Sequence, residues 1–423
     1  MKTLICVAFL LSFWNTSYAD KEAQSTILAI DDARNATTLV TKANNIVNGA
    51  HSNCPQIPAS DIPQFCEEPY KAICANTESH RSSILGHLDD IRKKSEQQAM
   101  EFIAKKYSLT AGDELMQKLK STGLLAFGDQ NLTQQYRDDF FEKTRELEAS
   151  YSEKADKEFQ ESHFQIIKVN LKRAIEASSL PTEKKQKFLS YIDREQFTSS
   201  DNIFNHKQDM KYAELFGRAL QICDSDGLKP LAVADDTDQT RAQGNQTLLI
   251  CSGRFAFHTK DDLPIEHLAN EFQVAAHEMS HIMSYHWEPQ MYRGLRKCVQ
   301  NRNASQIVSE YLQALKDNQS YTEEGAKNIE ENKTAFVDDH LEEYTPDFWA
   351  KGAIVQYFKN EGKSLSPTEK LNFLQNAYGY FCGSPESGDH PSGKLRIEMM
   401  GFDSNVRKQM GCTSPTKSPS CGL

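Results

Sequence analysis

Several features that define other protein classes are scarce or missing in this 423-residue chain. Twenty glycines and fourteen prolines are too few for a collagen-like protein, and 39% hydrophobic residues are too many for a disordered one. After residue 19, no stretch approaches the 18 consecutive apolar residues that a membrane-spanning helix requires. Positive charge is in deficit, because 48 Lys and Arg residues face 59 Asp and Glu residues, a net charge of −11. We therefore expect neither a nucleic-acid partner held by bulk electrostatics nor stable membrane insertion.

The first nineteen residues have the pattern of a secretory signal peptide. Lys2 supplies a short positive region, an apolar run extends from Leu4 to Trp14, and Ser17 and Ala19 are small residues before the expected cleavage site. The run is short for an uncleaved membrane anchor, which is the alternative, and the charged residues Asp20 and Lys21 follow it. We expect an exported protein, secreted or periplasmic, that is cleaved after Ala19.

In an exported protein, cysteines are expected to form disulfides rather than to stay reduced. Of ten cysteines, Cys6 lies in the expected signal peptide, and most of the other nine should form disulfides in an oxidising compartment. Three lie near the mature N-terminus and three near the C-terminus, so bridges between the two groups would close very long loops. The nine are Cys54, Cys66, Cys74, Cys223, Cys251, Cys298, Cys382, Cys412 and Cys421.

The chain between about residues 25 and 205 has the pattern of successive helices. The stretch 134–157 is densely charged with few apolar residues, which is typical of a long helix with a solvated face. Apolar stripes at helical spacing are formed by Ile84, Leu85, Leu88 and Ile91, and by Phe164, Ile167, Leu171 and Ile175.

The character of the sequence changes only briefly after residue 205. Short strands are expected at 230–234 and 247–251, and we expect no others in the chain. Helices then resume, and Ser366 and Glu369 form a capping box at the start of one of them. The sequence therefore predicts a mainly α protein with a small β element, divided into domains at 20–205 and 206–423.

One motif points to specific chemistry. Residues 277–281 read His-Glu-Met-Ser-His, an H-E-x-x-H pattern on an expected helix. His277 and His281 are four residues apart, so their imidazoles project from one face and can bind a single Zn²⁺ ion. Glu278 would lie beside the open coordination position and take a proton from an activated water. Apolar neighbours disfavour the alternative, a chance histidine pair on a surface helix.

A third ligand must come from another part of the chain. Ser284 and Trp287 stand where the metzincin pattern requires Gly and His, and Asn301 stands where the thermolysin-like pattern requires Glu. Further on, Glu343 and Asp347 would share a helix face, so one could bind metal while the other accepts the N–H of a ligand histidine. Taken alone, such an acidic pair is more often simply solvated.

Several segments together resemble the neprilysin family of zinc metallopeptidases. The Glu-x-x-x-Asp pair follows H-E-x-x-H after about 65 residues, as it does in that family. Residues 389–396 (Asp-His-Pro-Ser-Gly-Lys-Leu-Arg) are similar to the family's late segment, and residues 66–74, with a cysteine at each end, to its N-terminal segment. Residues 373–382, together with Cys412 and Cys421, resemble its C-terminal end.

The resemblance implies a zincin-like (gluzincin) catalytic domain at 206–423, roofed by a helical cap at 20–205. It implies Glu343 as the third ligand of one Zn²⁺ ion and Asp347 as the partner that orients a ligand histidine. It also implies that His390 stabilises the oxyanion and that Arg396 holds the substrate backbone. The disulfides that it implies are Cys66–Cys412, Cys74–Cys382 and Cys298–Cys421; we add Cys223–Cys251, which leaves Cys54 free.

The expected function is zinc-dependent endopeptidase activity on peptide or unfolded protein substrates. Ser284 and Pro346 depart from the family, which has Asp and Ala at these positions. A proline at 346 would kink the helix or begin a new one, so the choice between Glu342 and Glu343 stays open. Both departures favour an alternative function, a catalytically lapsed peptidase fold that binds peptides or proteins. The region before the motif is shorter than in the family, so longer substrates should reach the metal.

Overall fold

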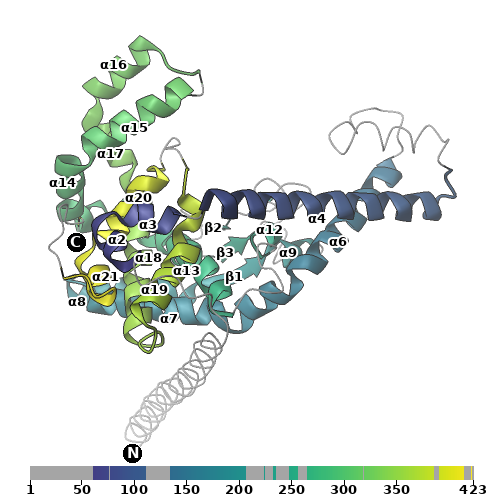
Figure 1. Cartoon of the computed structure of the whole chain (residues 1–423), viewed down its shortest axis with the longest axis horizontal. Helices are drawn as coiled ribbons and strands as arrows, with labels where there is room; N and C mark the ends of the chain where they lie inside the picture. Colours follow the sequence, from purple (N-terminus) through teal and green to yellow (C-terminus); the bar gives the residue numbers. More distant parts are fainter. Residues whose placement is uncertain are drawn as a thin grey trace, which may run out of the picture.

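The computed structural model describes residues 61–75, 77–110, 134–205, 223, 232–234, 247–255, 264–317, 319–384, 390–413 and 421. Helices predominate among these residues and strands are few, which confirms the predicted mainly α class with a small β element (Figure 1). The predicted signal peptide and Cys54 lie outside the described residues.

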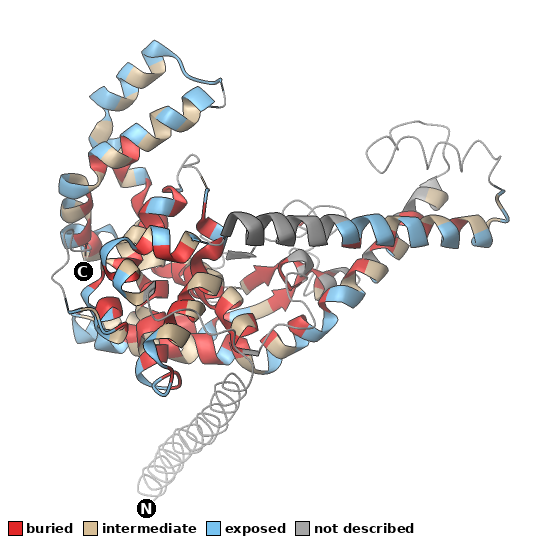
Figure 2. Ribbon diagram, viewed as in Figure 1, coloured by how far each residue is buried: buried red, intermediate tan, exposed pale blue. Residues whose placement is uncertain are grey.

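Two helices that carry the motif residues form the centre of the fold. α13 (Pro264–Ser280) packs against α18 (Leu341–Lys359), and α7 (Phe164–Ala177) and α19 (Pro367–Tyr378) pack against this pair. The predicted stripe of α7 is fully part of the core, and Ile91 of the other stripe is also buried. Figure 2 shows this region as the most continuous buried part of the molecule.

The core crosses the domain boundary that the sequence predicts near residue 205. Phe188 of α8 (Thr182–Arg194) belongs to the same buried cluster as Phe272 of α13 and Trp349 of α18. The rings of Phe188 and Trp349 meet edge to face, with centroids 6.0 Å apart. The boundary itself stays a prediction, but the helix that positions the motif is held by residues from both sides of it.

A three-stranded sheet lies beside these helices in the order β1-β3-β2. β2 (Ala232–Ala234) and β3 (Thr247–Ile250) confirm the two predicted strands and pair antiparallel. The expectation of no further strand was wrong, because β1 (Gln196–Ser199) pairs parallel with β3. This segment is four residues long and mostly polar, so it has little strand pattern of its own and depends on a partner some fifty residues later.

Two long helices form an arm that extends away from the body (Figure 1). α4 (Thr77–Lys106) packs against α6 (Gln134–Glu158), which confirms the long charged helix predicted at 134–157. Among the described residues of the α4–α6 arm, Ala99, Ile103 and Phe140 form a small buried apolar cluster. α6 continues through a π-helical turn, η2 (Phe159–His163), into α7.

The C-terminal half adds a second group of helices with its own small core around Tyr292, Leu295 and Val337. The capping box at Ser366 and Glu369 is present at the start of α19, as predicted. No helix in the described ranges is both long and apolar enough to cross a membrane. The remaining elements are α9 (Ser200–Asn205), α12 (Ser252–Phe255), η3 (His281–Met283), η4 (Pro289–Tyr292), α14 (Arg293–Arg302), α15 (Ala304–Asp317), α16 (Glu323–Glu331), α17 (Lys333–Asp339), η5 (Gly379–Phe381), α20 (Gly393–Gly401) and α21 (Ser404–Gln409).

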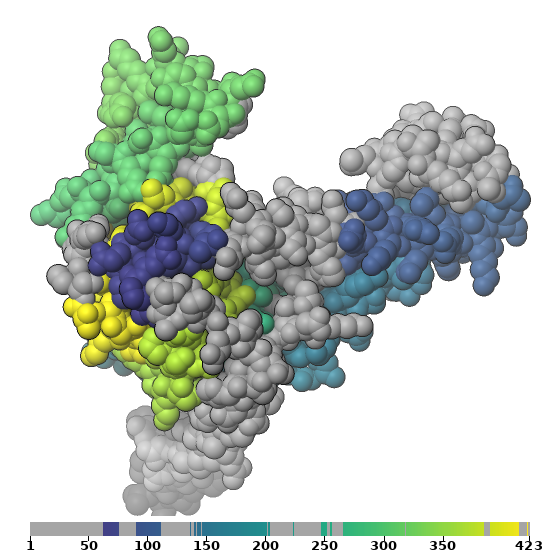
Figure 3. Space-filling model, in the orientation of Figure 1, coloured from purple at the N-terminus to yellow at the C-terminus, as the bar shows by residue number. Residues whose placement is uncertain are grey.

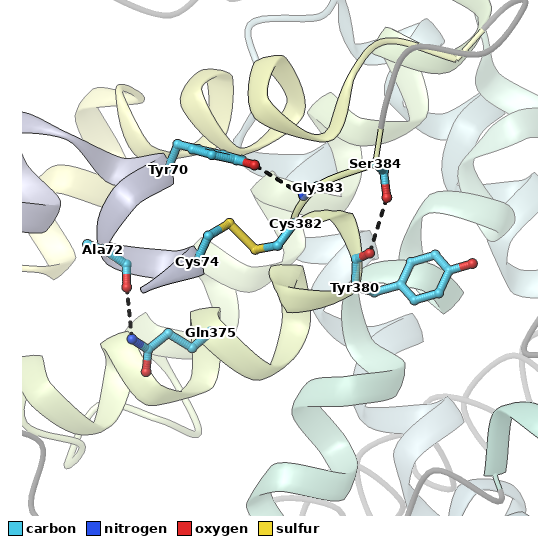
Figure 4. Close-up of a disulfide and its surroundings, with 8 residues drawn as sticks. All are labelled: Tyr70, Ala72, Cys74, Gln375, Tyr380, Cys382, Gly383 and Ser384. Atoms are coloured by element: carbon cyan, nitrogen blue, oxygen red, sulfur yellow. Dashed lines mark hydrogen bonds between the residues drawn. A yellow bond between two sulfur atoms is a disulfide. The ribbon is translucent and has the colours of Figure 1, made fainter. Parts of the chain in front are cut away.

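All four predicted disulfides are present in the structure: Cys66–Cys412, Cys74–Cys382, Cys223–Cys251 and Cys298–Cys421. The first two tie α2 (Asp61–Glu67) and α3 (Pro69–Cys74) to the C-terminal region, against which these helices lie in Figure 3. Hydrogen bonds support the Cys74–Cys382 bridge, because Gln375 donates to the carbonyl of Ala72 at 2.9 Å (Figure 4). The N-terminal segment is thus an integral part of the body that carries α13 and α18.

Candidate metal centre

The helix α13 carries the first half of the H-E-x-x-H motif. Its buried face includes Phe272, Ala276 and Met279, which fixes its rotation against the core. The α-helix ends at Ser280, and His281 begins the 3₁₀ turn η3 rather than continuing the α-helix as the sequence suggested. The two imidazoles still lie on one side, with ring centroids 4.9 Å apart and planes at 85°.

Glu343 approaches both histidines from α18. Its Oε2 lies 3.1 Å from Nε2 of His277, and its Oε1 lies 3.8 Å from Nε2 of His281. The neighbouring Glu342 turns outward and contacts Nδ1 of His286 at 3.1 Å. Its side chain is 45% exposed, against 7% for Glu343. The structure therefore brings Glu343, and not Glu342, to the motif, a choice that the sequence left open.

Pro346 does not disrupt this arrangement. Of the two effects predicted for this proline, a kink or a new helix, the second does not occur, because α18 begins at Leu341 and continues through Pro346 to Lys359. A proline inside a helix removes one N–H donor and crowds the carbonyl four residues earlier, but α18 continues past it. Glu343 and Asp347 therefore remain on one face of a single helix, as their spacing predicts.

Asp347 contacts the other ring nitrogen of His277. Its Oδ1 lies 2.8 Å from Nδ1 of His277, and Arg396 donates to both carboxylate oxygens at 2.6 and 2.7 Å. Gln273 donates to Oδ1 at 3.1 Å. A proton on Nδ1 is thereby directed to Asp347, so Nε2, which faces Glu343, is the nitrogen that would bind a metal after losing its own proton.

Arg396 occupies a different environment from the exposed one that substrate binding would suggest. Its side chain is buried, and its guanidinium lies 4.1 Å from the ring centroid of Phe381. Gly393, three residues earlier, lets α20 approach the same turn closely, since a Cβ at this position would lie 1.8 Å from the carbonyl oxygen of Phe381. The close packing of α20 on η5 thus fixes the position of Arg396 beside Asp347.

Gln273 was not predicted as a member of the site. Gln273 lies four residues before His277, on the same helix face, and is fully buried. The i, i+4 spacing from a predicted ligand was the available signal, because a polar residue on that face needs a buried partner.

Glu278 and His390 lie at the exposed side of the cluster. Oε2 of Glu278 is 3.8 Å from Nε2 of His281, and Nε2 of His390 is 3.4 Å from Oε2 of Glu343. The side chain of His390 is half exposed. All the residues predicted for the site are therefore close to one another, although they come from three separate parts of the chain.

The charges of the buried groups depend strongly on one another. Burial lowers the pKa of His277, but the carboxylates of Asp347 and Glu343 raise it by more, to about 10. Burial raises the pKa of Glu343, but His277, followed by His281 and His390, lowers it well below its usual range. Without a metal, His277 is therefore protonated at neutral pH, so a metal ion that binds here must displace that proton.

The residues fit a metal ion on two counts. Potential ligand atoms of His277, Glu278 and His281 all lie within 4.8 Å of one another. Oε2 of Glu343 is buried and makes no hydrogen bond of good geometry, and Nε2 of His277 is 3.1 Å away. Such a pair can be bridged by a cation, which makes this cluster a candidate metal centre.

No protein-family model, curated protein or solved structure matches the chain. The geometry of the site is accordingly the ground on which a function can be assigned.

Proposed function

We propose that this chain is a zinc-dependent endopeptidase with an active site similar to that of the neprilysin family, and that His277, His281 and Glu343 hold the metal. The position of Glu343 carries the proposal. A buried carboxylate from a second helix approaches both imidazoles, and one of its oxygens makes no hydrogen bond of good geometry. Two histidines and one glutamate are the ligand set of many catalytic zinc sites, in which a fourth position stays open.

The residues around this ligand set can each take a separate role in peptide hydrolysis. Zinc bound here would supply Lewis-acid activation of water and of the scissile carbonyl. Glu278, adjacent to the first ligand and near His281, would accept the proton of the attacking water and pass it to the leaving amine. His390, half exposed beside Glu343, would donate a hydrogen bond to the developing oxyanion.

The two other predicted residues, Asp347 and Arg396, are more buried than Glu278 and His390. Asp347 would hold His277 in the tautomer that presents Nε2 to the metal. Arg396 uses Nε and Nη2 on Asp347, which leaves Nη1 as the nitrogen that could reach a substrate carbonyl. We therefore expect Arg396 variants to weaken both metal binding and substrate binding.

Adjacent residues of the chain provide matched controls for the ligand assignment. Glu343→Ala should remove most of the bound zinc, whereas Glu342→Ala should leave zinc content unchanged. In the same way, His277→Ala or His281→Ala should abolish zinc binding, and His286→Ala should not. Zinc content is measured by atomic emission on protein dialysed against a weak chelator. Equal loss of zinc from Glu343→Ala and Glu342→Ala would contradict the assignment of Glu343 as a ligand.

Glu278→Gln separates catalysis from metal binding. This variant should retain zinc but cleave a random peptide pool at least about 100-fold more slowly than the parent, because the general base is lost. Full activity in Glu278→Gln would exclude the mechanism. Zinc binding without any cleavage by the parent would instead favour the alternative, a catalytically lapsed fold that binds peptides or proteins.

The compartment and substrate size follow from the parts around the site. Four disulfides are typical of a secreted or periplasmic protein, which supports export of this chain. The α4–α6 arm extends away from the body that carries the metal centre (Figure 1). We propose that long, flexible substrates are therefore accepted. One target sequence placed in a ten-residue peptide and in an unfolded protein should be cut in both, and cleavage of the short peptide alone would contradict this.

A further inference from the structure

The turn that carries His281 is held from outside its own helix. α13 ends at Ser280, and the three residues His281–Met283 form a single 3₁₀ turn. At Ser284 the backbone becomes extended, with φ −65° and ψ 169°. Regular α-helical hydrogen bonding therefore does not fix the direction of the His281 imidazole on its C-terminal side.

The first external contact is a hydroxyl on α18. The N–H of Tyr285 donates to Oγ1 of Thr345 at 2.9 Å, and this hydroxyl donates in turn to the carbonyl of Leu341 at 3.0 Å. Thr345 is completely buried. It lies two residues from Glu343, so the contact joins the segment after His281 to the helix that carries the third predicted ligand.

The second contact leads to the same helix by way of an aromatic pair. The hydroxyl of Tyr292 donates to the carbonyl of Met283, and Nε1 of Trp349 donates to that hydroxyl at 2.8 Å. Tyr292 and Trp349 are both buried, and Trp349 is on α18. The two contacts flank Ser284, so the chain on each side of that residue is attached to α18.

We infer that Thr345 is a positioning residue for His281, which it places against Glu343 by holding the backbone of Tyr285. The inference rests on the proposed function, in which both residues bind one zinc ion. A buried threonine in a helix commonly donates to the carbonyl four residues earlier, and Thr345 does so. What sets it apart is that it also accepts the N–H of a residue 60 positions away, in the segment that follows a predicted ligand.

The attachment through Thr345 is a neutral one. Ser284 stands where the resemblance predicts an aspartate that would orient His281, and Ser284 is buried. A metal site requires its ligands to be held within about 0.5 Å of their working positions by the residues behind them. Here a neutral backbone attachment to α18 fixes the separation of 3.8 Å between Nε2 of His281 and Oε1 of Glu343.

Two substitutions at one position test the inference. Thr345→Val keeps the shape of the side chain but removes the acceptor, and Thr345→Ser keeps the hydroxyl. We expect the zinc dissociation constant, measured by competition with a fluorescent chelator, to rise about 10- to 100-fold in Thr345→Val and less than about threefold in Thr345→Ser. Thr144→Val, the same change at a buried threonine of α6, should leave zinc affinity unchanged.

Cobalt provides a readout that general destabilisation does not change. The visible absorption of bound Co²⁺ reports ligand geometry, so Thr345→Val should alter the spectrum while Thr345→Ser and Thr144→Val reproduce that of the parent. If Thr345→Val does not fold, Tyr292→Phe, which removes the other attachment, takes its place with the same expected result.

The outcomes separate the two proposals. A parent protein that binds no zinc overturns the proposed function, and the inference with it. A parent that binds zinc while Thr345→Val retains parental affinity and spectrum overturns the inference alone. Equal weakening in the valine and serine variants would also overturn it, because the hydroxyl would then have no special role.

Discussion

The α13–α18 pair and the α4–α6 arm are both built from two long helices packed together, but they bury different residues. α18 is apolar on most of its surface, and Trp349, Ile354 and Phe358 are all almost fully buried. In the arm, α6 buries polar Thr144 and Glu148 along with Phe140. The α13–α18 pair can hold side chains in fixed positions because it lies within a large buried apolar cluster, whereas the arm projects from the body with a small cluster of its own (Figure 2).

The comparison also explains where charged residues can be buried. Asp347 and Arg396 lie inside the apolar body, and each is stabilised by the other through two hydrogen bonds. The arm instead forms pairs such as Lys106 with Asp139 at its surface. Removing one member of a buried pair leaves an isolated charge in the interior, which is far more costly than the same change in solvent.

The largest expected difference is in the free energy of unfolding, when a Phe→Ala substitution is made once in the body and once in the arm. Phe373 of α19 is buried beside α13 and α18, and its ring lies against those of Tyr357 and Phe358. Phe102 on the arm is 38% exposed. Phe373→Ala should lower the free energy of unfolding by about 3–5 kcal/mol, and Phe102→Ala by less than about 1 kcal/mol. Urea unfolding measures both, and similar losses would contradict the comparison.

A smaller effect is expected from a buried ion pair, and it should depend on pH. Burial raises the pKa of Asp403, but Lys351, with Nζ 2.9 Å from the carboxylate, and two backbone N–H groups lower it by more, to below its ordinary value of 3.8. Ionised Asp403 therefore stabilises the fold above about pH 4, and this contribution is lost as the pH falls through the lower folded pKa.

Asp403→Asn tests this dependence. It should reduce the free energy of unfolding by roughly 3 kcal/mol at pH 7, since Lys351 is left unpaired in the interior, and by clearly less at pH 3. Asp139→Asn on the arm should have a weaker effect that added salt reduces, because solvent screens its pair with Lys106. A loss in Asp403→Asn that is equal at pH 7 and pH 3 would exclude this role of the ion pair.

The smallest expected effect has the opposite sign and belongs to the arm. The hydroxyl of Thr144 is buried without a hydrogen-bond partner among the described residues. Thr144→Val should therefore raise the free energy of unfolding by up to about 1 kcal/mol, because it replaces an unsatisfied polar group with an apolar one of the same shape. A thermal melt beside that of the parent measures the change, and a destabilised variant would show that the arm requires polar packing.

Features that depend on local spacing were predictable from the sequence. The stripe of α7, the capping box of α19 and the placement of His277 on a buried helix all follow from periodicity within one segment. The disulfides Cys66–Cys412, Cys74–Cys382 and Cys298–Cys421 were predicted from the resemblance and are present. The helical features follow from patterns within a few residues, whereas the disulfide pairing came from the resemblance, because cysteine spacing alone does not select one connectivity.

Features that depend on distant partners were not predictable. β1 has almost no strand pattern and forms because β3 supplies its hydrogen bonds. The orientation of Glu343 rather than Glu342 toward the histidines depends on how α18 is rotated against α13, which no local pattern encodes. The pairing of Arg396 with Asp347 joins residues 49 positions apart and requires the close approach of α20 to η5.

The bridges Cys66–Cys412 and Cys74–Cys382 have a consequence for the covalent topology of the molecule. Residues 74 to 382 form a closed ring, and the whole α4–α6 arm, including the connection at 111–133, lies within it. A single backbone cut anywhere in that ring opens the loop but releases no fragment, since the two pieces stay linked through sulfur. The protein can therefore be nicked in its arm and remain one molecule until a reductant reaches both bridges.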